Sequence, residues 1–309
     1  MKTAFLFPGQ GAQTIGMGRD IAQAIPQAAQ IFQQANEILG YDLQSICFEG
    51  PAEKLNTTVY SQPAIFTASA AILAAIRANP STAELKPDVV AGLSLGEYTA
   101  LYAADALSFE QTLKLVAKRG QAMQDAANAT DGAMVSIIGC NAEQVKELCA
   151  KASQGEPLQA ANYNCPGQIV ISGAKNACER AEKLASEYGA IKAIRLAVNG
   201  AFHTSLMDLA AKALTEALNE CEFKDPSPIA VLANTSADYY ENTDAIKPGL
   251  IKQLTSPILW QASMEKLLDN NIEKYYEIGP SRVLTGLMRR INRKTKVINV
   301  STLSALESL

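Results

Sequence analysis

A serine between two glycines is the first feature of this sequence that could carry chemistry. The stretch Gly92-Leu93-Ser94-Leu95-Gly96 follows the apolar run Val89–Ala91 and precedes residues with helix-like spacing. This is the layout of a nucleophile elbow, in which small residues let a strand turn sharply into a helix. Chance often produces the same pattern in loops, but the flanking strand and helix favour a nucleophile by about three to one.

A serine nucleophile needs a base, and the sequence contains one histidine, His203. A lone histidine is by default a structural residue, but the elbow makes His203 the only imidazole available to activate Ser94. A positioned general base is worth roughly two to four orders of magnitude in rate.

With one histidine and no C-x-x-C among six cysteines, a Cys/His zinc site is improbable, and we expect reduced thiols near the core.

The N-terminal stretch Phe7–Gly18, FPGQGAQTIGMG, is rich in glycine but fits no nucleotide-binding motif. Thr14 stands where G-x-G-x-x-G requires its third glycine, and Met17 stands where a P-loop requires lysine. A tight glycine loop after a first strand can instead aim a backbone N–H at an oxyanion. The N–H of Leu95, at the start of the helix that leaves the elbow, is the natural second donor.

The elements that must position these residues alternate between strand and helix. We expect a helix from about Asp20 to Leu39, another over Gln62–Ala78, and strands at TAFLF, PDVVAGLS, IAVLANT and KYYEIG. This alternation predicts an α/β fold with a mostly parallel sheet. Between residues 129 and 198 the order becomes β-α-β-β-α-β, which is the ferredoxin-like pattern. The predicted domains are a large one, residues 1–128 and 199–309, and a subdomain, residues 129–198.

Five motifs together resemble the malonyl-CoA:acyl carrier protein transacylase family of fatty acid and polyketide synthesis. They are GQGAQ, the elbow serine before LGEYTAL, KRGQAMQ, NYNCPGQIVISG and GAFH, in order along nearly the whole chain. The resemblance implies an α/β-hydrolase-like large domain with an inserted ferredoxin-like subdomain.

The resemblance also assigns roles to individual residues. Ser94 would be the acyl-carrying nucleophile and His203 its base, oriented by the main-chain carbonyl of Gln253. The N–H groups of Gln10 and Leu95 would form the oxyanion hole. The pantetheine arm would contact Asn162 and Gln168.

Arg119, in KRGQAMQ, would hold the malonyl carboxylate. The alternative is an arginine on a helix surface beside Lys118, which is the commoner fate of an arginine. A charged hydrogen bond from the guanidinium is worth roughly 1.5–3 kcal/mol, enough for about tenfold to a hundredfold selection. One departure from the family is Leu93, where a histidine usually precedes the nucleophile, and we expect it to alter packing more than chemistry.

The predicted function is ping-pong transfer of malonyl from malonyl-CoA to the phosphopantetheine thiol of an acyl carrier protein. No metal or other cofactor is needed. The positive charge of the basic segment LMRRINRKTK could steer the acidic carrier, although a solvated helix end explains the segment equally well. A hydrolase remains open, because Asp131 lies between Ser94 and His203 in the usual triad order. A catalytically silent binding subunit is the second alternative.

Composition bounds the remaining expectations. The chain has 309 residues, 48% apolar and 19% charged, with a net charge of −4, which is typical of a soluble globular protein without a nucleic-acid surface. We expect no membrane span, because the most apolar run, Gln62–Ala78, looks too short. The N-terminus looks like a strand and not a signal peptide, so a cytoplasmic protein is expected. A monomer is compatible with these observations.

Overall fold

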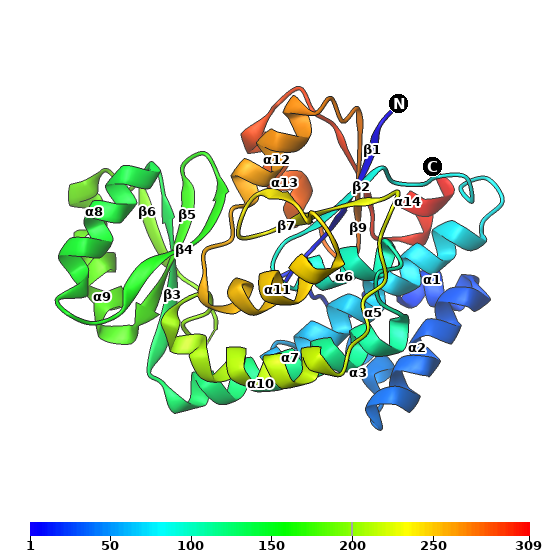
Figure 1. Cartoon of the computed structure of the whole chain (residues 1–309), viewed down its shortest axis with the longest axis horizontal. Helices are drawn as coiled ribbons and strands as arrows, with labels where there is room; N and C mark the ends of the chain where they lie inside the picture. Colours follow the sequence, from blue (N-terminus) through cyan, green and yellow to red (C-terminus); the bar gives the residue numbers. More distant parts are fainter. Residues whose placement is uncertain (199) are drawn as a thin grey trace.

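The computed structural model describes residues 1–198 and 200–309, which form two sheets surrounded by helices (Figure 1). The larger sheet has the order β10 (Val297–Val300), β9 (Lys274–Ile278), β1 (Thr3–Phe7), β2 (Val89–Gly92), β7 (Ala230–Ala233) and β8 (Asp238–Tyr239). Its neighbouring strands are parallel except for the last pair, β7 and β8. The predicted mostly parallel sheet is therefore confirmed.

The smaller sheet is antiparallel and is built from one continuous stretch of chain. Its order is β4 (Leu158–Cys165), β5 (Gln168–Ala174), β3 (Gly132–Ile138) and β6 (Lys192–Arg195), and it carries the helices α8 (Ala142–Ser153) and α9 (Lys175–Leu184). This is the expected β-α-β-β-α-β order, and Figure 1 shows it as a separate lobe. The division into domains stays a prediction, and its boundary at residue 199 lies outside the described residues.

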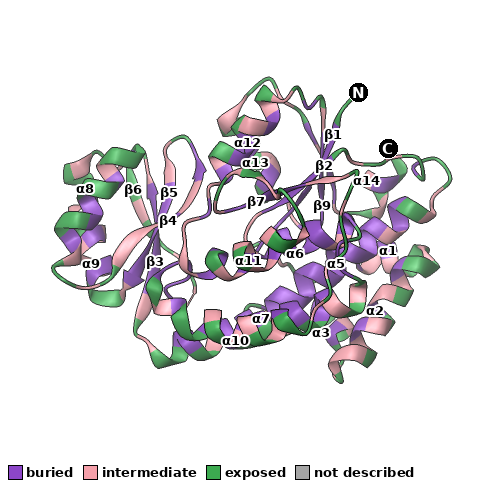
Figure 2. Cartoon of the chain, in the orientation of Figure 1, coloured by how far each residue is buried: buried purple, intermediate pink, exposed green. Residues whose placement is uncertain are grey.

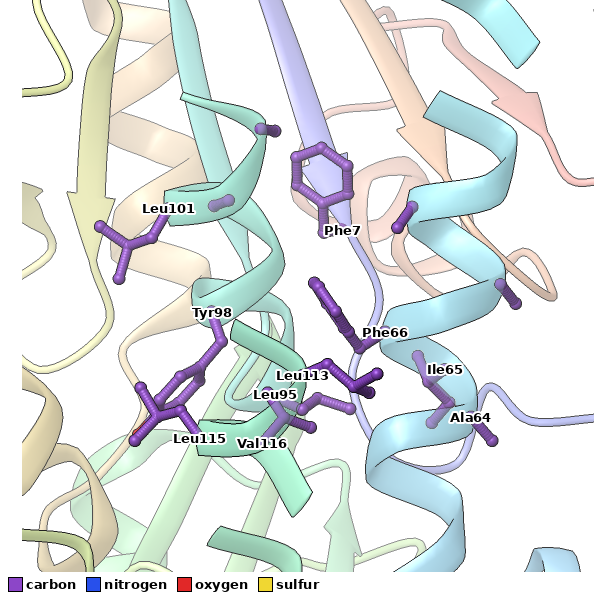
Figure 3. Close-up of a cluster of buried hydrophobic side chains, with 14 of the residues drawn as sticks. Phe7, Ala64, Ile65, Phe66, Leu95, Tyr98, Leu101, Leu113, Leu115 and Val116 are labelled. Atoms are coloured by element: carbon purple, nitrogen blue, oxygen red, sulfur yellow. The ribbon is translucent and has the colours of Figure 1, made fainter. Parts of the chain in front are cut away.

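Three helices form the core beneath the elbow: α5 (Thr58–Ala78), α6 (Leu95–Ala103) and α7 (Phe109–Ala129). In Figure 3 the side chains of Phe7, Phe66, Leu95 and Val116 meet between these helices and β1. Because they are buried on all sides, the backbone that carries Ser94 rests on a close-packed support.

Helix α5 is longer than the sequence led us to expect. It has 21 residues and passes a length and composition test for a membrane span, although 83% of its most apolar window is buried inside the protein. Figure 2 shows this helix enclosed by its neighbours. Core helices of globular domains have the same property. Pro63, expected near the start of this helix, is its sixth residue.

The prediction of a single helix from about Asp20 to Leu39 is wrong. The chain forms α1 (Arg19–Ala24) and α2 (Pro26–Leu39), separated by Ile25 in an extended conformation, φ −124° and ψ 111°. A residue before proline is pushed out of the helical region by the proline ring, so Pro26 ends one helix and begins the next.

Several elements were not identified from the sequence. They are the edge strands β8 and β10 and the helices α3 (Leu43–Glu49), α4 (Ala52–Leu55), α11 (Ile246–Thr255) and α14 (Leu303–Glu307). The remaining helices are α10 (Asp208–Asn219), α12 (Trp260–Asp269) and α13 (Val283–Ile291).

As expected, the six cysteines are free thiols, five of them buried.

The fold brings three chain segments to one edge of the larger sheet. Because β1, β2 and β7 are parallel neighbours, the segments that follow them meet at their carboxyl ends. These segments carry Gln10, Ser94 and Asn234 respectively. The smaller sheet is tied to the same region, since Tyr163 N–H donates to the carbonyl of Ile258 at 2.9 Å.

Candidate active site

The turn at Ser94 has the geometry of a nucleophile elbow. Ser94 has φ 53° and ψ −102°, a conformation that costs energy for any residue with a side chain. A Cβ on Gly92 would lie 2.0 Å from the carbonyl carbon of Gly96, and one on Gly96 would lie 2.1 Å from the oxygen of Phe7. Both glycines are therefore required by the close approach of the elbow to itself and to β1.

The Ser94 hydroxyl lies against the imidazole of His203. The Ser94 Oγ and His203 Nε2 atoms are 3.0 Å apart, and His203 Nδ1 is 2.7 Å from the main-chain oxygen of Gln253. A carbonyl oxygen only accepts, so Nδ1 carries the hydrogen and Nε2 is free to accept the Ser94 proton. The geometry therefore suits a serine–histidine dyad oriented by a backbone carbonyl.

The environment of His203 keeps the imidazole neutral. Burial, reinforced by the positive charge of Arg119, lowers the pKa of His203 to about 4. At neutral pH the ring can therefore accept a proton. Its backbone has φ 61°, and the Gln159 side chain in β4 donates to its carbonyl oxygen at 2.9 Å.

Asp131 does not orient His203. Its side chain is exposed, directly before β3, and lies 3.8 Å from the ammonium of Lys175, the first residue of α9. The Ser-Asp-His order that kept a hydrolase triad open in the sequence therefore does not form a triad with Asp131.

Arg119 is not on the protein surface. Its side chain is 1% exposed, and its Nη2 atom donates to Ser94 Oγ at 3.0 Å and to Gln253 Oε1 at 2.9 Å. Nη1 donates to Gln62 Oε1 at 2.8 Å, and the guanidinium carbon lies 5.2 Å from the centre of the Tyr98 ring. Within the described residues, the Nε atom has no hydrogen-bond partner. A cation with a free donor thus lies beside the serine hydroxyl.

The dyad opens into a cavity of about 420 Å³ between the two sheets. The sequence-predicted residues that line it are Ser94, His203, Gln10, Asn162 and Gln168. Apolar side chains form much of the remaining wall: Leu93, Met123, Met134, Val170, Leu196, Val198, Phe202, Val283 and Leu287. A mostly apolar channel with a few amides suits an extended arm that carries amide groups.

The two expected oxyanion donors lie in segments next to Ser94. Leu95 is the first residue of α6, and Gln10 follows β1, whose neighbour Gly9 approaches the Leu93 carbonyl so closely that a Cβ would lie 2.2 Å from its oxygen. Among residues 1–198 and 200–309, neither the Gln10 nor the Leu95 N–H donates to a protein acceptor. Gln253, Asn162 and Gln168 are also brought to the site, so none of the predicted residues is left outside it.

Three residues at the site were missed from the sequence. Asn234 accepts from Ser94 N–H at 2.6 Å and donates to the Gly92 oxygen at 2.7 Å, so it clamps both sides of the elbow. Glu97 is buried, and its backbone N–H donates to the carbonyl oxygen of Ser94 at 3.1 Å. Asn164 lines the cavity, and its Oδ1 has no partner in the described part of the chain.

Each missed residue had a weak signal in the sequence. Asn234 ends an apolar strand, and Glu97 interrupts an apolar helix. Asn164 shares a strand face with Asn162 because strand side chains alternate.

Comparisons with known proteins show the family to which the chain belongs. Residues 4–304 match the acyl transferase domain family. A malonyl CoA-acyl carrier protein transacylase of Bacillus subtilis is 45% identical over 307 residues, which cover 99% of this chain and 95% of the relative. The Haemophilus influenzae protein of the same name is 41% identical over 100% of this chain and 98% of its own length.

The chain belongs to the malonyl-CoA:acyl carrier protein transacylase family of acyl transferases.

The family resemblance drawn from five motifs is thereby confirmed, and the protein is an acyltransferase. Solved structures of family members superpose closely. The transacylase of Coxiella burnetii gives a TM-score of 0.95 at 37% identity, covering 100% of this chain and 96% of that one. A malonyl-transacylase solved with its type II PKS acyl-carrier protein gives 0.95 at 38% identity, covering 100% and 98%.

Proposed function

We propose that this acyltransferase moves a malonyl group from malonyl-CoA to the phosphopantetheine thiol of an acyl carrier protein. One observation carries the proposal: the base His203 and the cation Arg119 both contact the same hydroxyl, each at 3.0 Å. A nucleophile with a cation beside it suits an acyl group that ends in a carboxylate. The names of the relatives support the same donor and acceptor.

In the first half-reaction, Ser94 Oγ attacks the thioester carbon while its proton passes to His203 Nε2. The tetrahedral oxyanion accepts hydrogen bonds from the N–H groups of Gln10 and Leu95. When the C–S bond breaks, the departing CoA thiolate takes the proton from His203. The product is a malonyl ester on Ser94, with its carboxylate on Arg119.

In the second half-reaction, the carrier's thiol gives its proton to His203 and attacks the ester. The tetrahedral intermediate collapses, the Ser94 Oγ–acyl bond breaks, and His203 returns the proton to the serine. The Gln253 carbonyl stabilises the imidazolium in both halves, in the role that a carboxylate has in hydrolases. Asn162 and Gln168, on the cavity wall, are the proposed contacts of the pantetheine arm.

The basic segment near the C-terminus is the proposed carrier surface. Arg289, Arg290 and Arg293 are exposed and line a hollow of about 630 Å³. Arg290 donates to the side-chain oxygen of Gln168 at 2.7 Å, so this surface adjoins the arm-binding cavity. Charge reversal at Arg289 and Arg293 should raise the KM for the carrier without changing the KM for malonyl-CoA. An unchanged carrier KM would contradict the proposal.

Intact-protein mass spectrometry after exposure to a panel of acyl-CoAs tests the proposed function. One malonyl group should be added to the chain and none to Ser94→Ala, and the acyl group should leave when carrier is supplied. A hydrolase would instead release CoA beyond one equivalent without carrier. A silent binding subunit would show no mass increase.

A further inference from the structure

Glu97 is a further buried ionisable group near the nucleophile, three residues along the chain from Ser94, and the proposed reaction does not use it. Its side chain is 1% exposed, and both carboxylate oxygens are hydrogen-bonded. Oε1 accepts from the Tyr240 hydroxyl at 2.5 Å. Oε2 accepts from Gln253 Nε2 at 2.6 Å and, more weakly, from Asn234 N–H at 3.3 Å. Burial raises the pKa of Glu97 to about 7, against the hydrogen bonds and the charge of Arg119.

The side-chain amide of Gln253 connects Glu97 to the cation at the active serine. Its Oε1 accepts from Arg119 Nη2, and its Nε2 donates to Glu97 Oε2. The two opposite charges are therefore one amide group apart. Among the described residues, the other ionisable groups that interact with Glu97 are the phenols of Tyr98 and Tyr240, and burial raises the pKa of both, that of Tyr98 to about 12. His203, which adjoins the same network, is neutral. In the empty site, the positive charge of Arg119 is thus balanced by the negative charge of Glu97.

We propose that Glu97 is the counter-charge of Arg119 in the empty site and takes up a proton from the medium when the malonyl carboxylate binds Arg119. This inference rests on the proposed function. With the substrate carboxylate present, an ionised Glu97 would leave a buried site with two anions and one cation. An uncompensated buried charge is costly, and the neighbouring anion favours the neutral acid. Protonation restores the balance.

The hydrogen-bond network can accept this proton without rearrangement. Within the described residues, the partner of Oε1 is a hydroxyl group, which can accept as well as donate. Oε2 keeps both of its donors. The Gln253 side chain therefore stays in place, and so does the backbone carbonyl that orients His203. Glu97 is accordingly a positioning residue that also tunes specificity, because an acetyl group brings no charge and should drive no proton uptake.

Proton uptake on ligand binding tests the inference directly. Malonyl-CoA and acetyl-CoA are titrated calorimetrically into the Ser94→Ala chain in buffers of different ionisation enthalpy. Acetyl-CoA corrects for protons exchanged by the CoA phosphates. With a pKa of about 7, Glu97 is about 90% ionised at pH 8 and about 10% ionised at pH 6. Malonyl-CoA should therefore take up about 0.9 extra proton at pH 8 and about 0.1 at pH 6, and should bind about tenfold more weakly at pH 8.

Variants of the network identify the group that titrates. Glu97→Gln, which mimics the protonated acid, should abolish the extra uptake in the Ser94→Ala background and make malonyl-CoA affinity independent of pH between 6 and 8. Glu110→Gln is the matched control, since Glu110 is exposed on α7 and pairs with Lys114. It should behave as the Ser94→Ala parent. If Glu97→Gln does not fold, Tyr240→Phe replaces it. Loss of that donor raises the pKa of Glu97, so uptake at pH 7 should fall.

Equal proton uptake with malonyl-CoA and acetyl-CoA would overturn the inference, as would full uptake in Glu97→Gln. Either result, with a malonyl ester still formed on Ser94 of the unmodified chain, would leave the proposed function standing. Absence of that ester would overturn both.

Discussion

Replacing Arg119 with alanine should lower the preference of the enzyme for malonyl-CoA over acetyl-CoA, compared with the parent. Arg119 is 1% exposed, so the carboxylate it is proposed to hold is paired away from water. Truncating one member of a buried charge pair costs about 2–5 kcal/mol. Taking about 2–4 kcal/mol, the loss for malonyl-CoA is about thirtyfold to a thousandfold in kcat/KM. An acetyl group makes no such pair and should lose far less.

The measured quantity is the ratio of kcat/KM for malonyl-CoA to kcat/KM for acetyl-CoA. This ratio is independent of the fraction of folded enzyme. That matters because the substitution also leaves the side-chain oxygens of Gln62 and Gln253 without their donor. Arg119→Lys keeps the charge without the planar fork and should give an intermediate ratio. Arg195→Ala, on an exposed strand of the smaller sheet, is the control and should leave the ratio unchanged. A fall of less than threefold in Arg119→Ala would refute the carboxylate clamp.

Three further predictions concern the dyad and its support. His203→Ala should slow acylation of Ser94 by about 10²–10⁴-fold, and a normal acylation burst would contradict the dyad. The kcat/KM of the parent should fall as pH drops through about 4, where His203 gains a proton. An acid limb near 6.5 would contradict the lowered pKa of His203. Asn234→Ala removes the hydrogen-bond partner of Ser94 N–H and of the Gly92 oxygen. Denaturant titration should show a free energy of unfolding lower by about 1–3 kcal/mol. In kinetic assays kcat should fall by a larger factor than KM rises. No change in kcat would mean that the clamp is not needed. Leu93→His should preserve acylation, whereas Leu93→His combined with His203→Ala should remain inactive; rescue by the new histidine would refute the assignment of the base.

The sequence was sufficient to predict the pair Ser94 and His203, which the structure brings to 3.0 Å, because their types are rare and their settings restrictive. His203 is the only imidazole in the chain, and Ser94 is flanked by glycines that the turn requires. The class of fold also followed from the alternation of strands and helices. Helix boundaries were less accurate, because local rules such as the effect of Pro26 on Ile25 compete with the hydrophobic pattern.

The surroundings of those side chains depend on contacts between distant segments. The bond from Ser94 N–H to Asn234 joins residues 140 apart in sequence, and the bond from Arg119 to Gln253 joins residues 134 apart. Periodicity and spacing carry no information on such pairs. The family resemblance supplied Gln253 and Arg119, but the contacts of Asn234 and Glu97 became visible only in the folded chain.

The sequence by itself determined which atoms could react. Glycines must stand where a Cβ would meet backbone, and a single histidine leaves one choice of base. Tertiary structure decided what those atoms can do. It separated Asp131 from the dyad, brought a carbonyl to His203, and enclosed Arg119 and Glu97 on either side of one amide. The physical reason is that proton affinity and charge pairing depend on burial and on distances of a few ångströms, which packing sets between segments far apart in the chain.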